Sequence, residues 1–150
     1  MSHVPLILIS DDEPLVVSAL ARLARRVGLS FISDTTSDHV LQLARERKPD
    51  LIILDVNQRT DGRDLLASLK KDPSTRDIKV LMLSAYEDQY IRHQCLELGA
   101  EDYVVKPFDA VFISKVARLC GLLLEASATS WTAPPSVDSH PQVAIRLGAE

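Results

Sequence analysis

The most constraining feature of the sequence is a run of four apolar residues, Leu51-Ile52-Ile53-Leu54, between polar segments. A strand exposed on one face alternates apolar and polar residues, whereas a continuous apolar strand is buried on both faces. Strands buried in this way belong to parallel sheets that helices cover on both sides. The run therefore predicts an α/β fold built on a parallel sheet.

The same pattern, a short apolar run followed by an amphipathic stretch, occurs five times along the chain. The apolar runs occupy residues 6–9, 31–32, 51–54, 80–83 and 103–105. Helical spacing of apolar residues predicts helices from Pro14 to Gly28, from near Ser37 to Lys48, between Gly62 and Asp72, before Gly99, and from Asp109 to about Glu125. Five such units predict one doubly wound, five-stranded parallel sheet with helices on both faces.

Length and composition fit a single domain with a tail. The chain has 150 residues, of which 46% are hydrophobic and 25% charged, values that exclude a wholly disordered chain and a disulfide-stapled miniprotein. Ser, Thr, Ala and Pro dominate from residue 126 onward. We therefore expect a domain over 1–125 and a Pro/Ser-rich linker or tail over 126–150. Whether Trp131 of this tail docks on the domain, on a partner or on nothing is left open by the sequence.

Charge and hydropathy argue against two classes of partner. The net charge of −4 gives no basic surface for nucleic acid or for anionic lipid. No apolar run reaches the roughly 18 to 20 residues that span a bilayer, and the first residues lack the basic segment of a signal peptide. We expect a cytoplasmic protein that binds neither nucleic acid nor membrane directly.

Polar side chains follow four of the five predicted strands, at the point where each strand ends. They are Asp11, Asp12 and Glu13 after the first strand, Asp55 and Asn57 after the third, Ser84 after the fourth and Lys106 after the fifth. The carboxyl ends of parallel strands share one edge of a sheet. Clustered carboxylates repel by about 1–4 kcal/mol per pair at a surface-like dielectric, and a hard cation such as Mg²⁺ removes that conflict. With Lys106 to neutralise phosphoryl oxygens, the set points to phosphoryl transfer with a carboxylate nucleophile.

These motifs give the chain a resemblance to the receiver domains of two-component response regulators, of the chemotaxis-regulator type. The segments that carry it are LILISDDEP, DLIILDVN, KVLMLSA and GAEDYVVKPF, within residues 5–124. The resemblance implies the flavodoxin-like receiver fold. It also implies a signalling switch, not a turnover enzyme, that uses Mg²⁺ and takes its phosphoryl group from a sensor histidine kinase or a phosphotransfer protein.

The resemblance further implies a role for each residue of the site. Asp55 is the phosphoacceptor and a metal ligand, Asp12 a direct Mg²⁺ ligand, Asp11 a ligand through water or a support, Asn57 a ligand through its backbone carbonyl, Lys106 the partner of the phosphoryl group, and Ser84 and Tyr103 the switch pair. Phosphorylation would draw Ser84 inward and let Tyr103 fill the vacated space. A downstream protein would then read the altered face between the fourth and fifth helices.

The chain also departs from the family pattern. Gln58-Arg59 stands where the family usually has Met-Pro or a similar pair, which predicts a more polar and less constrained loop. Arg59 could face water, assist a phosphodonor or bind an anion. Ser10, where the family usually has an apolar residue, is expected only to polarise the strand end. Asn57 and Tyr86 stand at positions that tune phosphoryl lifetime, and neither offers an acidic group that would activate water.

Two other functions stay open at this point. The chain could be a receiver-like scaffold that binds partners without phosphorylation, which the Gln58-Arg59 loop motivates. It could also be a Mg²⁺-dependent phosphatase of the haloacid-dehalogenase type, although that class wants an acid where Asn57 stands. The last predicted helix has an apolar end, from Leu119 to Leu124. We expect this end to be covered by the tail or by a second copy of the chain in a homodimer. The sequence names neither the kinase nor the downstream partner.

Overall fold

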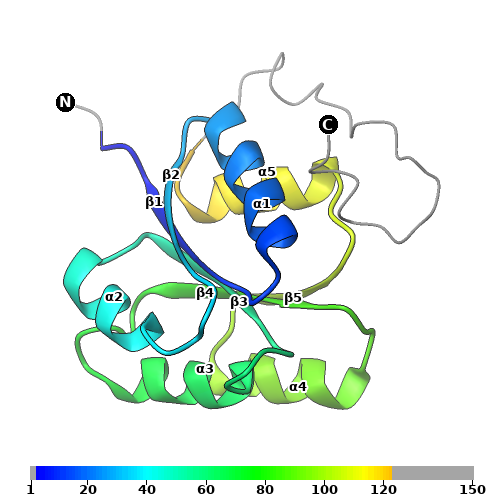
Figure 1. Cartoon of the computed structure of the whole chain (residues 1–150). Helices are drawn as coiled ribbons and strands as arrows, with labels where there is room; N and C mark the ends of the chain where they lie inside the picture. The colour runs from blue at the N-terminus through cyan, green and yellow to red at the C-terminus, as the bar shows by residue number, and fades with distance from the viewer. Residues whose placement is uncertain (1–2, 123–150) are drawn as a thin grey trace.

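The computed structural model describes residues 3–122 and consists of one five-stranded parallel sheet between two layers of helices (Figure 1). The strands are β1 (Leu6–Ser10), β2 (Ser30–Asp34), β3 (Leu51–Asp55), β4 (Lys79–Ser84) and β5 (Asp102–Val105), in the order β2-β1-β3-β4-β5. The helices are α1 (Pro14–Arg26), α2 (Val40–Arg47), α3 (Gly62–Lys71), α4 (Gln89–Leu98) and α5 (Ala110–Leu119). The predicted doubly wound α/β fold is confirmed.

The two faces of the sheet carry separate apolar cores, because α1 and α5 cover one face and α2, α3 and α4 cover the other (Figure 1). Every residue of β3 is buried. Ile53 packs into the α1–α5 core, whereas Ile52 and Leu54 pack into the opposite core. A strand whose alternate residues enter two cores must be apolar throughout, which explains the uninterrupted run in the sequence.

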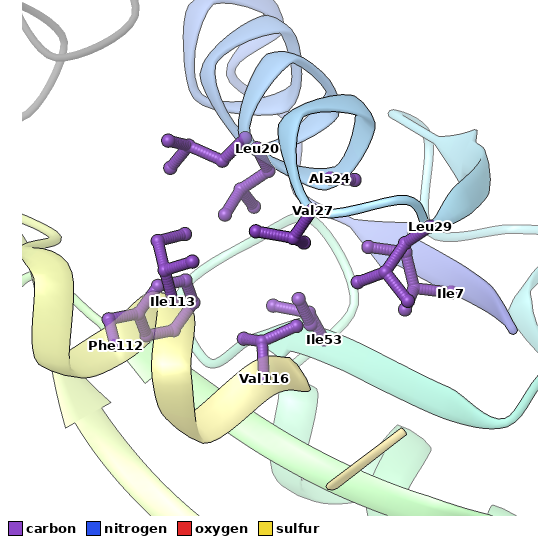
Figure 2. A pocket seen from close by; sticks show the side chains of 10 residues that line it. Ile7, Leu20, Ala24, Val27, Leu29, Ile53, Phe112, Ile113 and Val116 are labelled. Carbon is purple, nitrogen blue, oxygen red and sulfur yellow. The ribbon is translucent and has the colours of Figure 1, made fainter. Parts of the chain in front are cut away.

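The space between α1 and α5 is filled by apolar side chains that converge above the sheet (Figure 2). Phe112, Ile113 and Val116 of α5 face Leu20 and Ala24 of α1 across a small cavity. The ten side chains that line this cavity are all apolar. It is therefore a packing feature of the core, since a polar ligand would find no hydrogen-bonding partner among them.

The helix α2 begins at Val40, three residues later than Ser37, where the sequence predicts its start. Ser37 has φ of 65°, and its Oγ accepts a hydrogen bond of 3.1 Å from the backbone N–H of Thr60. The carboxylate of Asp34 accepts bonds from the backbone N–H groups of Thr36 and His39. These bonds shape residues 35–39 into a turn before the helix begins.

The helix α5 ends at Leu119, so its predicted extension to about Glu125 is wrong. Gly121 has φ of 82°, and its N–H donates to the carbonyl of Arg118 while the N–H of Leu122 donates to that of Ala117. This pair of bonds around a left-handed glycine is a Schellman termination. Leu119, Cys120 and Leu122 pack partly buried against the domain's own core, while Leu123, Leu124 and the tail lie outside the described residues. Within residues 3–122, the helices are too short or too polar to cross a bilayer.

Candidate functional site

Three carboxylates meet at the edge formed by the carboxyl ends of β1 and β3. These strands are neighbours, with Ser10 opposite Leu54 in the register, so Asp11 follows β1 beside Asp55 at the end of β3. Asp11 and Asp55 are 1% and 3% exposed, respectively, and Asp12 is exposed. One carboxylate oxygen from each of the three lies within 4.8 Å of the other two. The structure thus brings together the acidic residues that the sequence predicts to meet.

Lys106 comes to the same place from the segment after β5. Its Nζ lies 3.1 Å from Oδ2 of Asp11 and 3.6 Å from Oδ1 of Asp55. It also lies 3.3 Å from Oε1 of Glu13, a contact that sequence reasoning did not assign, although Glu13 directly follows the acidic pair. The Lys106 side chain is only 10% exposed, so its ammonium group is held among the carboxylates.

The electrostatics of the site show that one ammonium does not balance its negative charge. Burial, and then the charge of Asp11, raise the pKa of Asp55 to about 7, against the lowering effects of Lys106 and the Asn57 N–H. Burial also raises the pKa of Asp11 despite the nearby Lys106. Burial by itself would lower the pKa of Lys106, but the charges of Asp11 and Asp55 reverse this and raise it. Such an oxygen-rich, electron-rich site suits a hard divalent cation.

Ser84 and Tyr103 lie next to this edge and are connected through the backbone of Tyr86. Ser84 ends β4 and is 2% exposed, and its Oγ accepts a 3.1 Å bond from the Tyr86 N–H. The hydroxyl of Tyr103 donates a 2.9 Å bond to the carbonyl of Tyr86. Tyr103 is itself buried, and the Arg92 guanidinium carbon lies 5.0 Å from the centre of its ring. The two predicted switch residues therefore both form hydrogen bonds with the backbone of Tyr86.

Comparison with known proteins assigns the chain to a family. Residues 7–118 match the family model of the response regulator receiver domain. The chain belongs to this family. Receiver domains are the signal-receiving parts of two-component systems and interact with histidine kinases. The predicted resemblance is thereby confirmed.

Two relatives illustrate the similarity in sequence. The phosphate regulon transcriptional regulatory protein PhoB of Pseudomonas aeruginosa is 35% identical over 132 residues, which are 87% of this chain and 57% of PhoB. The transcriptional activator protein IrlR of Burkholderia pseudomallei is 42% identical over 129 residues, 84% of this chain and 53% of IrlR. The chain thus spans little more than half the length of these relatives.

Solved structures share the receiver fold. A response regulator described as putative from Chloroflexus aurantiacus superposes with a TM-score of 0.74 at 28% identity, over 79% of this chain and 99% of that one. A response regulator protein from Burkholderia pseudomallei, determined with a phosphorylated aspartic acid, a calcium ion and citrate, gives 0.68 at 26% identity, over 84% and 69% of the two chains.

The structure also defines the loop after β3, where the sequence predicts a departure from the family pattern. Gln58 donates a 2.9 Å hydrogen bond from Nε2 to the backbone carbonyl of Asp55, and its Oε1 accepts one of 3.2 Å from Oγ of Ser10. The expectation of a less constrained loop is therefore wrong at Gln58. The expectation that Ser10 only polarises the strand end is also wrong, because its hydroxyl donates this hydrogen bond to Gln58. Arg59 is exposed and lies 3.6 Å from the Asp38 carboxylate, in line with the solvent-facing alternative.

Two further positions shape the loop. Asn57 is exposed, and its backbone N–H acts to lower the pKa of the Asp55 carboxyl group. Gly62, the first residue of α3, packs so closely that a Cβ there would lie 2.4 Å from the carbonyl oxygen of Asp55 and 2.8 Å from Cα of Val56. Only glycine fits this contact. In the sequence, this contact is indicated only by the presence of a glycine at the start of a predicted helix.

Proposed function

We propose that this receiver domain accepts a phosphoryl group on Asp55 from a sensor histidine kinase or a phosphotransfer protein. The observation that carries the proposal is the position of the Asp55 carboxylate, buried at the end of β3 and close to the Lys106 ammonium and to the carboxylates of Asp11 and Asp12. The Burkholderia pseudomallei structure with a phosphorylated aspartic acid supports the same chemistry by similarity.

Mg²⁺ is the proposed cofactor, because the donor atoms are carboxylate oxygens whose negative charges repel one another unless a cation lies among them. Asp12 and Asp55 would bind the ion directly, Asp11 through a water molecule, and Asn57 through its backbone carbonyl. A bound Mg²⁺ would neutralise charge on the phosphoryl oxygens during transfer. The calcium ion in the Burkholderia pseudomallei protein is consistent with a divalent cation at such a site.

The transfer itself is a displacement at phosphorus. A carboxylate oxygen of Asp55 attacks the phosphorus of a phosphohistidine, the P–N bond breaks, and its electron pair stays on the imidazole nitrogen, which takes up a proton. The attacking oxygen must be deprotonated, and the ammonium of Lys106 at 3.6 Å favours that form. After transfer, Lys106 would pair with an oxygen of the new phosphoryl group.

The phosphoryl group would act on the rest of the domain through Ser84. A hydrogen bond from the Ser84 hydroxyl to a phosphoryl oxygen would compete with the contact between Ser84 and the Tyr86 N–H. The carbonyl of Tyr86 also accepts a hydrogen bond from the Tyr103 hydroxyl. The competition at Ser84 would therefore disturb the Tyr103 side chain as well. The face between α4 and α5, which β5 separates, would then differ between the two states, and a downstream protein would bind one state more tightly.

The test is the intact mass of the protein after incubation with acetyl phosphate and Mg²⁺. We expect one phosphoryl group on the wild type and none on Asp55→Ala. Lack of an adduct on the folded wild type would instead favour a scaffold that works without phosphorylation. Many turnovers of a phosphomonoester would favour a phosphatase. An equal adduct on Asp55→Ala would refute Asp55 as the acceptor.

A further inference from the structure

Gln58, in the loop after β3, and Ser10, at the end of β1, contact each other across the site. The side chain of Gln58 turns back onto its own loop, where Nε2 donates to the Asp55 carbonyl at 2.9 Å. The same amide also reaches β1, where Oε1 accepts from Ser10 Oγ at 3.2 Å and Nε2 lies 3.4 Å from the Ser10 carbonyl oxygen. One side chain therefore bonds to the ends of both strands.

The location of this bridge matters because β1 and β3 carry different parts of the site. Ser10 directly precedes Asp11, and Gln58 lies three residues after Asp55. The bond from Gln58 to the Asp55 carbonyl closes a small ring of backbone that contains Asn57. Gly62 packs on the same carbonyl from the side of α3. The backbone of Asp55 is thus held between a hydrogen bond and a close steric contact.

The two partners also depend on each other. Ser10 is fully buried, at 0% exposure, and its hydroxyl donates to Gln58. An apolar residue at position 58 would leave that hydroxyl without this partner, and a buried polar group without a partner is destabilising. An apolar residue at position 10 would likewise remove one of the bonds that orient the Gln58 amide. Ser10 and Gln58 therefore form one structural feature.

We propose that Gln58, oriented by Ser10, is a positioning residue that holds the loop after β3 in the conformation that binds the cation. It touches neither the cation nor the phosphoryl group and acts through the backbone of Asp55 and Asn57. Fixing this loop in advance removes the cost of ordering it when the cation binds. The inference rests on the proposed function, since it assumes that the carboxylates and the Asn57 carbonyl bind Mg²⁺.

The experiment compares wild type with Gln58→Met, which keeps the length of the side chain and removes its hydrogen bonds. Calorimetric titration with Mg²⁺ should show binding weakened by about tenfold, the low end of the loss seen when residues that orient metal ligands are replaced. In the metal-free protein, the backbone amides of residues 57 and 58 should exchange with solvent faster. Gln42→Met is the matched control, because Gln42 makes a comparable bond to Glu46 on the exposed surface of α2.

A second variant tests the coupling. Ser10→Ala should weaken Mg²⁺ binding as well, and Ser10→Ala combined with Gln58→Met should be little worse than Gln58→Met by itself. Unchanged Mg²⁺ affinity together with unchanged amide exchange in Gln58→Met would overturn the inference. If the wild type failed to bind Mg²⁺, the proposed function would fail, and faster metal-free exchange in Gln58→Met would still support the positioning role.

Discussion

At the scale of single residues, the chemistry proposed for this receiver domain depends on the protonation of Asp55. Its pKa is raised to about 7 by burial and by Asp11, so without a cation the carboxyl group holds its proton through much of the acidic range. An unfolded chain releases the same proton near pH 4. Raising the pH from about 4 to 7 therefore stabilises the unfolded chain relative to the folded domain, and the free energy of unfolding falls over this window.

Asp55→Asn should remove this pH dependence, because the amide does not ionise. In the presence of EDTA, we expect the variant to be more stable than wild type at pH 8, by on the order of 1–3 kcal/mol. The two proteins should converge as the pH falls toward 4, where wild type keeps this proton in the folded state and has regained about half of it in the unfolded state. Urea denaturation at pH 4, 6 and 8 measures the difference. A wild type more stable than the variant at pH 8 would contradict the raised pKa.

Asp72 offers a control of opposite sign. The side-chain hydrogen bond from Arg45, followed by bonds from Ser74, lowers the pKa of Asp72 to about 2. A lowered pKa contributes stability that is present above about pH 4 and is lost as the pH falls toward 2. Asp72→Asn should therefore be less stable than wild type at pH 8, and this difference should shrink on acidification. Urea denaturation at the same pH values, extended to about pH 2, separates a local effect at Asp55 from a general effect of removing a carboxylate.

At the scale of elements, the sequence predicts strands better than helix ends. A strand buried on both faces must be apolar throughout, so β3 and β4 can be recognised in the sequence as short uninterrupted runs of apolar residues. The start of α2 depends on the contact between Ser37 and Thr60, which lie far apart in the sequence. The end of α5 depends on the left-handed conformation of Gly121, which the apolar residues on either side conceal in the sequence. Contacts formed only in the folded domain decide both ends.

The junction of β3 and α3 gives a prediction at this scale. In Gly62→Ala, the new Cβ would overlap the Asp55 carbonyl and the Val56 backbone, so the loop must move. We expect a loss of about 1–3 kcal/mol in stability, typical of overpacking, and a weaker beryllofluoride adduct measured by ¹⁹F NMR with Mg²⁺.

Gly28→Ala is the matched control for Gly62→Ala. Gly28 has φ of 84° but open space around its Cβ position, so alanine there should cost stability through backbone strain and leave the adduct unchanged. A normal adduct in Gly62→Ala would show that the close contact with Asp55 is dispensable. An equal loss of adduct in both variants would show that general destabilisation is responsible.

At the scale of the whole molecule, the topology accounts for what could be predicted about the site. Parallel strands end at one edge whatever their order, so residues as distant as Asp11 and Lys106 can be placed together from the sequence. The bridge between Gln58 and Ser10 could not be predicted in this way, because it depends on side-chain conformations across two strands. The resemblance led us to expect both positions to be unusual, but it did not pair them.

A cation that binds only the folded domain should stabilise the whole molecule by mass action. At a Mg²⁺ concentration of 100 times its dissociation constant, the free energy of unfolding should rise by about 2.7 kcal/mol. Asp12→Asn should lose most of this gain and change the metal-free stability little, because Asp12 is exposed and surface substitutions are usually worth within about 0.5 kcal/mol. Thermal denaturation with MgCl₂, against NaCl at equal ionic strength, measures both effects.

The control for Asp12→Asn is Asp77→Asn, an exposed carboxylate just before β4, at the opposite edge of the sheet. It should retain the full response to Mg²⁺, since a cation held by Asp11, Asp12 and Asp55 does not involve it. A response lost equally in both variants would indicate a diffuse effect of negative surface charge. A full response in Asp12→Asn would remove Asp12 from the proposed ligands, and no response in wild type would mean that the three carboxylates meet without binding the ion.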